Sequence, residues 1–80
     1  MEFSLALDTP RNELSGFTSH TATLIWENGC GNDCVERFYK RDHVELMREV
    51  LLFIKTKGHQ IVSFDVSELE RRRIITFHTT

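Results

Sequence analysis

One stretch of the chain has a clear helical repeat of hydrophobic positions. Within residues 44–54, the apolar side chains fall on one half of a helix that turns 100° per residue, and the charged side chains fall mainly on the other half. Asp42 and Glu45 form a capping box at its start, and Gly58 follows where a left-handed residue ends a helix with little strain. The pattern predicts an amphipathic helix over about residues 43–57.

Five other segments are typical of β-strands, because apolar and polar residues alternate along them or because they are rich in β-branched residues. The predicted strands are residues 2–8, 20–27, 34–40, 59–66 and 72–78.

Two connections between these strands have distinct features. Residues 9–19 contain turn residues, and we expect a short helical turn at residues 11–14. Residues 28–33 are rich in Gly, Asn and Asp and are expected to form the tip of a hairpin. The register of the strand that follows is open, since either Val35 and Tyr39 or Phe38 on the opposite side could face the core.

These elements predict an α+β fold in a single small domain, residues 1–80. A mainly antiparallel five-stranded sheet, in the order β-β-β-α-β-β, carries the helix on one face. The alternation then places Ile25, Ile61 and Ile74 on the other, open face, which is more apolar surface than solubility requires. Two interpretations have about equal weight: an ordinary, mildly apolar outer face, and a protein-binding or homodimer surface.

Composition and charge argue against several classes of function. A chain of 80 residues has little apolar material for a deep catalytic cleft, so we expect no enzyme. The net charge of −2 gives no long-range attraction for nucleic acid. No apolar run approaches the ~20 residues that span a membrane, and no basic leader precedes a hydrophobic segment. We therefore expect a cytoplasmic protein without a membrane contact.

The two cysteines give only a weak indication of a metal or redox site. Cys30 and Cys34 are separated by three residues, whereas zinc and redox pairs usually have two, and the histidines lack the spacing that would complete a zinc site. A disulfide is within reach, but free thiols are the default in a reducing compartment. His43 fits a neutral, partly buried side chain at the helix start better than a catalytic base. We expect no metal and no cofactor.

The only run of three basic residues is Arg71, Arg72 and Arg73. On a strand, Arg72 would point away from its two neighbours, so the run does not form a single patch. Charged residues on a terminal strand also discourage aggregation at the edge of a sheet. Nucleic-acid binding through these arginines together with Lys40 and Arg41 remains the alternative function.

The sequence favours a non-enzymatic protein-binding module that acts as a regulator, an adaptor or a stoichiometric inhibitor. Small acidic chains of this profile are common among phage and plasmid proteins that inhibit host machinery, which supports the interpretation by association only. Leu52 adds a possible contact, because it lies in the middle of the polar half of the helix. The candidate binding residues are Ile25, Thr23, Ile61, Ile74, Leu52, Asn28, Gly29, Asn32 and Asp33. A metal or thiol site at Cys30 and Cys34 is the second alternative.

Overall fold

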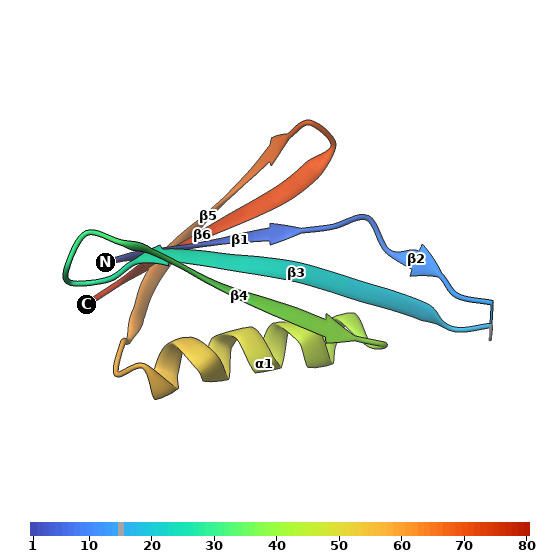
Figure 1. The fold of residues 1–80 in the computed structure, drawn as a ribbon, viewed down its shortest axis with the longest axis horizontal. Coiled ribbons are helices and arrows are strands. Elements are labelled where there is room, and N and C mark those ends of the chain that lie inside the picture. The colour runs from blue at the N-terminus through green and yellow to red at the C-terminus, as the bar shows by residue number, and fades with distance from the viewer. Residues whose placement is uncertain (15) are drawn as a thin grey trace.

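The computed structural model describes residues 1–14 and 16–80, and in this part of the chain one helix packs on an antiparallel sheet of six strands (Figure 1). The elements are β1 (Glu2–Leu7), β2 (Arg11–Asn12), β3 (Thr18–Glu27), β4 (Asp33–Lys40), α1 (His43–Thr56), β5 (Ile61–Leu69) and β6 (Arg72–Thr79). The predicted α+β class is confirmed. The sheet has one strand more than predicted, the two-residue β2.

The order of strands places the long β3 between β4 and β1, with β6 and then β5 beyond β1. All pairs are antiparallel. β2 pairs with the first residues of β3 and continues the line of β1 along β3 (Figure 1), so the sheet is in effect five strands wide. Consequently β4 and β5 form its two edges.

The helical turn predicted at residues 11–14 is wrong. Arg11 and Asn12 pair with Ser19 and Thr18, which makes this connection a short hairpin. The buried Ser19 hydroxyl donates a hydrogen bond of 2.8 Å to the Glu13 carboxylate, which satisfies a polar group inside the fold. Ser15, in the same connection, lies outside the described residues.

The helix has the predicted position. Its Asp42 cap accepts a hydrogen bond from the Val44 N–H at 3.3 Å, where the sequence pattern suggested the N–H of Glu45. Gly58 has a φ of +86°, the left-handed conformation expected just after the last turn.

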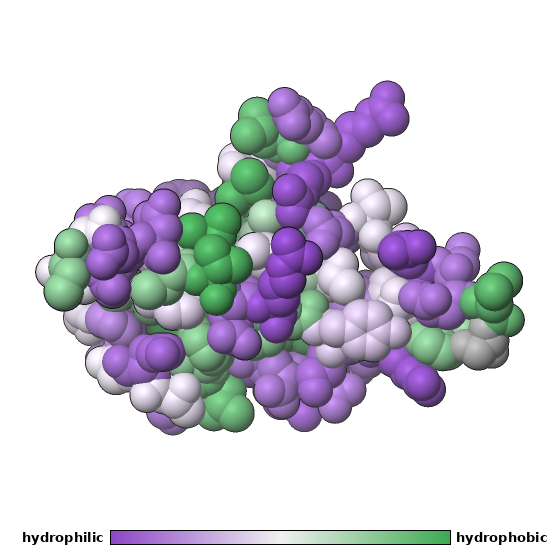
Figure 2. Space-filling view, in the orientation of Figure 1, coloured by the Kyte–Doolittle hydropathy of each residue, from purple (hydrophilic) through white to green (hydrophobic). Residues whose placement is uncertain are grey.

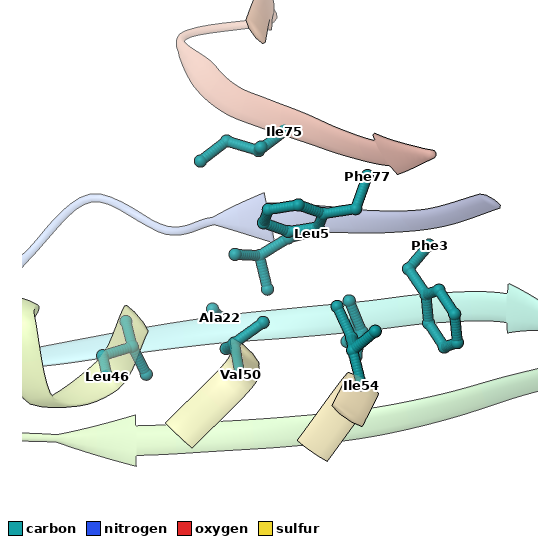
Figure 3. Close-up of a cluster of buried hydrophobic side chains, with 9 residues drawn as sticks. Phe3, Leu5, Ala22, Leu46, Val50, Ile54, Ile75 and Phe77 are labelled. Atoms are coloured by element: carbon teal, nitrogen blue, oxygen red, sulfur yellow. The ribbon is translucent and has the colours of Figure 1, made fainter. Parts of the chain in front are cut away.

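The hydrophobic core lies between α1 and the middle strands of the sheet. Leu46, Val50 and Ile54 of α1 point toward the sheet (Figure 3), and all three are buried. The remaining core residues come from β1, β3 and β6: Phe3, Leu5, Ala22, Leu24, Ile75 and Phe77. The core therefore joins segments that are distant in sequence, through one stripe of the helix.

The hairpin of β3 and β4 settles the register that the sequence left open. Phe38 is the cross-strand partner of Ala22 and so faces the helix, whereas Val35 and Tyr39 lie on the open face, the face of the sheet turned away from α1. The five-residue loop between the strands is organised by the Asn28 side chain, which accepts hydrogen bonds from two backbone N–H groups of the loop. This loop is a defined turn.

Two leucines of α1 give a direct test of this packing. Leu46 is 1% exposed and Leu52 is 52% exposed. We expect Leu46→Ala to lower the free energy of unfolding by about 3 kcal/mol, through lost burial and the cavity left behind. Leu52→Ala, the matched control, should change it by less than about 0.5 kcal/mol. Urea denaturation followed by circular dichroism measures both, and equal losses would contradict the assigned helix orientation.

Candidate protein-binding surfaces

The helix does not cover the whole of the sheet face on which it lies, because the core ends at β6 and leaves β5 exposed. α1 lies closest to β4 and β3, and Phe53 packs against Phe38 and Trp26 with ring centroids 5.7 and 5.4 Å apart. At the other edge every residue of β5 after Ile61 is exposed. Figure 1 shows the hairpin of β5 and β6 projecting away from the helix.

Apolar side chains on β5 therefore have no cover. Phe64 and Val66 are the cross-strand partners of Phe77 and Ile75, two core residues, and so they point to the same face of the sheet as the core. The Phe64 and Phe77 rings are 6.5 Å apart. Phe64 is nevertheless 62% exposed and Val66 54% exposed, and Figure 2 shows hydrophobic residues on the projecting hairpin.

The flank of α1 that faces these strands is also apolar. At 3.6 residues per turn, Met47 and Leu51 lie roughly 120–160° around the helix from Phe53, which marks the flank toward β4. They therefore lie toward β6 and β5. Together with Val44 and two neighbours they line a shallow pocket of about 380 Å³, and Val44 is 62% and Leu51 42% exposed.

We call Phe64 and Val66 of β5 together with Val44, Met47 and Leu51 of α1 the uncovered surface. Its two halves flank Ile75 and Phe77, which are the last core residues on this side. Exposed apolar side chains grouped in this way are typical of surfaces that bind another molecule.

A cleft with both apolar and charged lining residues adjoins the α1 side of the uncovered surface. It has a volume of about 490 Å³ and lies between the first turns of α1 and the end of the β5–β6 hairpin. Its lining residues are Leu7, Asp8, Thr9, Pro10, His20, Thr21, His43, Leu46, Glu68, Arg71 and Arg73. The His20 and His43 rings contact each other edge to face at 5.6 Å, and His43 also borders the shallow pocket on α1. The cleft thus adjoins the α1 half of the uncovered surface at His43.

The three consecutive arginines are divided as the strand alternation predicts. Arg71 and Arg73 line the cleft, whereas Arg72 is bound to the Asp8 carboxylate at 2.7 Å. Arg41 is also occupied, because its guanidinium lies 3.9 Å from the centre of the Phe17 ring. Lys40 pairs with His20 on the β4 edge. Of the five basic residues of the nucleic-acid alternative, only Arg71 and Arg73 share one place, so the five do not form a single patch.

The open face holds Ile25, Thr23 and Ile74 of the predicted binding residues and is less apolar than expected. Ile25 is 41% exposed, Thr23 and Ile74 are half-buried, and Arg37 is the cross-strand partner of Thr23. The placement of Ile61 on this face is wrong. A bulge between Ile61 and Ser63 shifts the register, so Ile61 pairs with Thr79 and packs against the core.

The remaining predicted residues lie elsewhere. Leu52 is exposed on the polar side of α1, on the opposite side of the sheet from Ile25. Asn28, Gly29 and Asn32 belong to the loop after β3, and Asp33 begins β4. The structure therefore does not bring the predicted residues together into one site.

The described residues show no further ligands that would complete a metal site at Cys30 and Cys34. Cys30 and Cys34 are free thiols, and in residues 1–14 and 16–80 no group of three or more His, Cys, Asp or Glu side chains is arranged to hold a metal ion. Within the same residues no helix is long and apolar enough to cross a membrane.

Comparisons with known proteins give no indication of function, so the functional argument depends on the surfaces described above. No family model matches the chain, and searches of curated proteins and of solved structures find no match either.

Sequence reasoning missed the uncovered surface, because the alternation that put Ile61 on the open face put Phe64 and Val66 on the core side, and the helical repeat put Val44, Met47 and Leu51 on the buried half of the helix. A simple comparison of dimensions could have found it. Five strands spaced by ~4.8 Å span about 19 Å between the outer strands, whereas a helix with its side chains is about 10 Å wide. One helix therefore cannot cover such a sheet.

The turn at the end of the β5–β6 hairpin is unusual. Glu70 and Arg71 have φ values of +51° and +67°, as in a type I′ turn, for which Asn and Gly are the preferred residues. Non-glycine residues in this conformation cost about 1 kcal/mol each. The turn therefore keeps two charged side chains at some cost in stability.

Replacing this turn should stabilise the protein. We expect Glu70→Asn with Arg71→Gly to raise the free energy of unfolding by about 1 kcal/mol, because the new residues prefer the left-handed conformation. Glu70→Ala, which keeps a Cβ atom, serves as the control and should give no gain. Chemical denaturation of the variants measures this. A double variant whose free energy of unfolding is unchanged or lower would show that Glu70 and Arg71 are not strained in the left-handed conformation.

Proposed function

We propose that the protein is a non-enzymatic binding module that acts on another protein as a regulator, an adaptor or a stoichiometric inhibitor, and that it binds through the uncovered surface. The observation that carries this proposal is the exposure of Phe64 and Val66 on the same face as the core. In a monomer, side chains of this kind are normally buried.

The energetics support a partner contact. Burying apolar area contributes about 25 cal/mol per Å², so covering the exposed parts of Phe64, Val66, Val44 and Leu51 would contribute several kcal/mol. Part of that gain offsets the loss of translational and rotational freedom on association. Exposed aromatic and aliphatic side chains are also the usual centre of a protein interface.

The open face is a weaker candidate. Ile25, Val35 and Tyr39 are exposed there, but Arg37 and Thr23 lie among them. Charged residues are depleted at the centres of protein interfaces. We therefore place the binding surface on the helix side of the sheet rather than on the open face.

Nucleic-acid binding is also less favoured. Arg72 is bound by Asp8, and Arg41 stacks on Phe17, so two of the five basic residues already have partners. Arg71 and Arg73 share their cleft with the Glu68 and Asp8 carboxylates. A phosphate backbone needs several free positive charges along one path.

Paired substitutions test the proposed surface. Phe64→Glu with Val66→Glu should abolish association with a partner captured from the native host, because two carboxylates would have to be buried in the contact. The fold should persist, since both side chains are exposed and contribute little to the core. Affinity capture with quantitative mass spectrometry measures the association, and circular dichroism checks the fold.

Ile25→Glu with Val35→Glu is the matched control, because it introduces the same charges at exposed apolar positions of the open face. This variant should capture the same partner as the unmodified protein. The reverse pattern, with loss only in the Ile25/Val35 variant, would move the binding surface to the open face. Retention of the partner by both variants would eliminate both surfaces.

A further inference from the structure

The outer side of β5 is an open edge of the sheet. β5 pairs with β6 on one side, and in the described part of the chain no backbone hydrogen bond joins its other side to another segment. Every residue of β5 after Ile61 is exposed, and Figure 1 shows its hairpin projecting away from α1. An edge of this length is a template on which another strand can pair.

The two edges of the sheet differ in how well they are protected. β4, at the other edge, carries Arg37 and Lys40 and lies against α1. β5 contains no Lys, Arg or Pro, the residues that usually prevent pairing at an edge. Its bulge affects only its first residues, since the pairing with β6 is regular from Ser63 to Leu69. The β5 edge is therefore the more accessible of the two to an added strand.

The sequence of β5 is complementary to itself when two copies run antiparallel. Cross-strand partners lie on the same face, so a two-fold axis between identical strands must pass at a residue. With the axis at Phe64, the two Phe64 side chains lie opposite each other. Val62 then lies opposite Val66 of the second copy. Ser63 lies opposite Asp65, whose carboxylate can accept a hydrogen bond from the hydroxyl.

The neighbouring registers are less favourable. An axis at Asp65 places two carboxylates directly opposite each other, which is destabilising. An axis at Ser63 places Asp65 opposite Ile61, and an axis at Val66 places Phe64 opposite Glu68. Among these four registers, only the axis at Phe64 matches apolar with apolar and polar with polar side chains.

The charges of β5 are compatible with this register. The Asp65 carboxylate already lies 2.7 Å from Nε2 of His78, and Glu68 is the cross-strand partner of Arg73 on β6. At the end of the new pairing, Glu68 lies opposite the neutral Gln60 of the second copy. No two like charges are therefore opposed across the axis.

We propose that two copies of the chain associate through β5, antiparallel about a two-fold axis at Phe64, so that their sheets join into one. Because the paired strands share their faces, both α1 helices lie on the same side of the joined sheet. The uncovered surfaces of the two copies are then neighbours on that side. This inference goes beyond the proposed function, because the new contact is made at the edge of β5 by a second copy of this chain.

The available area limits the strength of this contact. Val62, Phe64 and Val66 are 68%, 62% and 54% exposed. Complete coverage of these side chains in both copies would bury on the order of 500 Å². Stable interfaces bury at least about 1,200 Å², so we expect a weak dimer with a dissociation constant on the order of 100 µM.

Sedimentation equilibrium at several concentrations tests the association. The unmodified protein should be mainly monomeric at about 10 µM and mainly dimeric at about 1 mM. Phe64→Lys places two positive charges opposite each other and should leave the protein monomeric at both concentrations. Val35→Lys, which changes a 55% exposed apolar residue of the β4 edge, is the matched control and should dimerise as the unmodified protein does.

Disulfide cross-linking tests the register and leaves Phe64 in place. Val62→Cys and Val66→Cys are made separately in a protein that also carries Cys30→Ser and Cys34→Ser. A mixture of the two variants should form a mixed disulfide on mild oxidation, because the two positions lie opposite each other. Either variant alone should not cross-link, since each cysteine would lie about 13 Å from its own copy along the strand.

Three results would overturn the inference: a protein that stays monomeric at about 1 mM, a dimer that Phe64→Lys does not weaken, or no mixed disulfide. A strictly monomeric protein would leave the β5 edge to a strand of another protein. The proposed function survives all three results if the Phe64/Val66 variant still loses the captured partner. Failure of the proposed function, by contrast, would appear as capture that is unaffected by that variant.

Discussion

The fold depends on the contact between one stripe of α1 and the middle of the sheet. Leu46, Val50 and Ile54 are one turn apart and bury themselves against β1 and β3, where Leu5 and Leu24 are fully enclosed. A helix of about four turns is marginal in water, and an isolated hairpin is too. Each element is therefore stable only because the other covers its apolar side.

The same contact explains the exposed surface. The helix follows β4 closely and packs Phe53 against Phe38, so it is fixed near one edge of the sheet. The strands at the other edge still carry apolar residues on the helix side, because the alternation that buries Phe77 also orients Phe64. An exposed apolar surface thus results from a sheet wider than its helix, and a partner that covers it would extend the core.

Much of the fold could be predicted from the sequence, because local patterns determine it. The capping residue Asp42, the apolar stripe and Gly58 define the helix, and the alternation along β1, β3 and β6 identifies which residues face it. Features that depend on tertiary pairing could not be predicted. The pairing of Arg11 with Ser19 forms only once β3 is in place, and the bulge after Ile61 shifts a register that alternation alone assigns to the wrong face.

The candidate site was the least predictable part, since it depends on which apolar side chains the helix fails to reach. Methyl NMR with a neutral soluble gadolinium chelate measures this directly, because the relaxation of each methyl group increases with its access to solvent. We predict a strong enhancement for Val66, comparable to that of Val44, and a weak one for the buried Val50. Val66 methyl groups as protected as those of Val50 would show that the β5 edge of the sheet is covered, and would contradict the account.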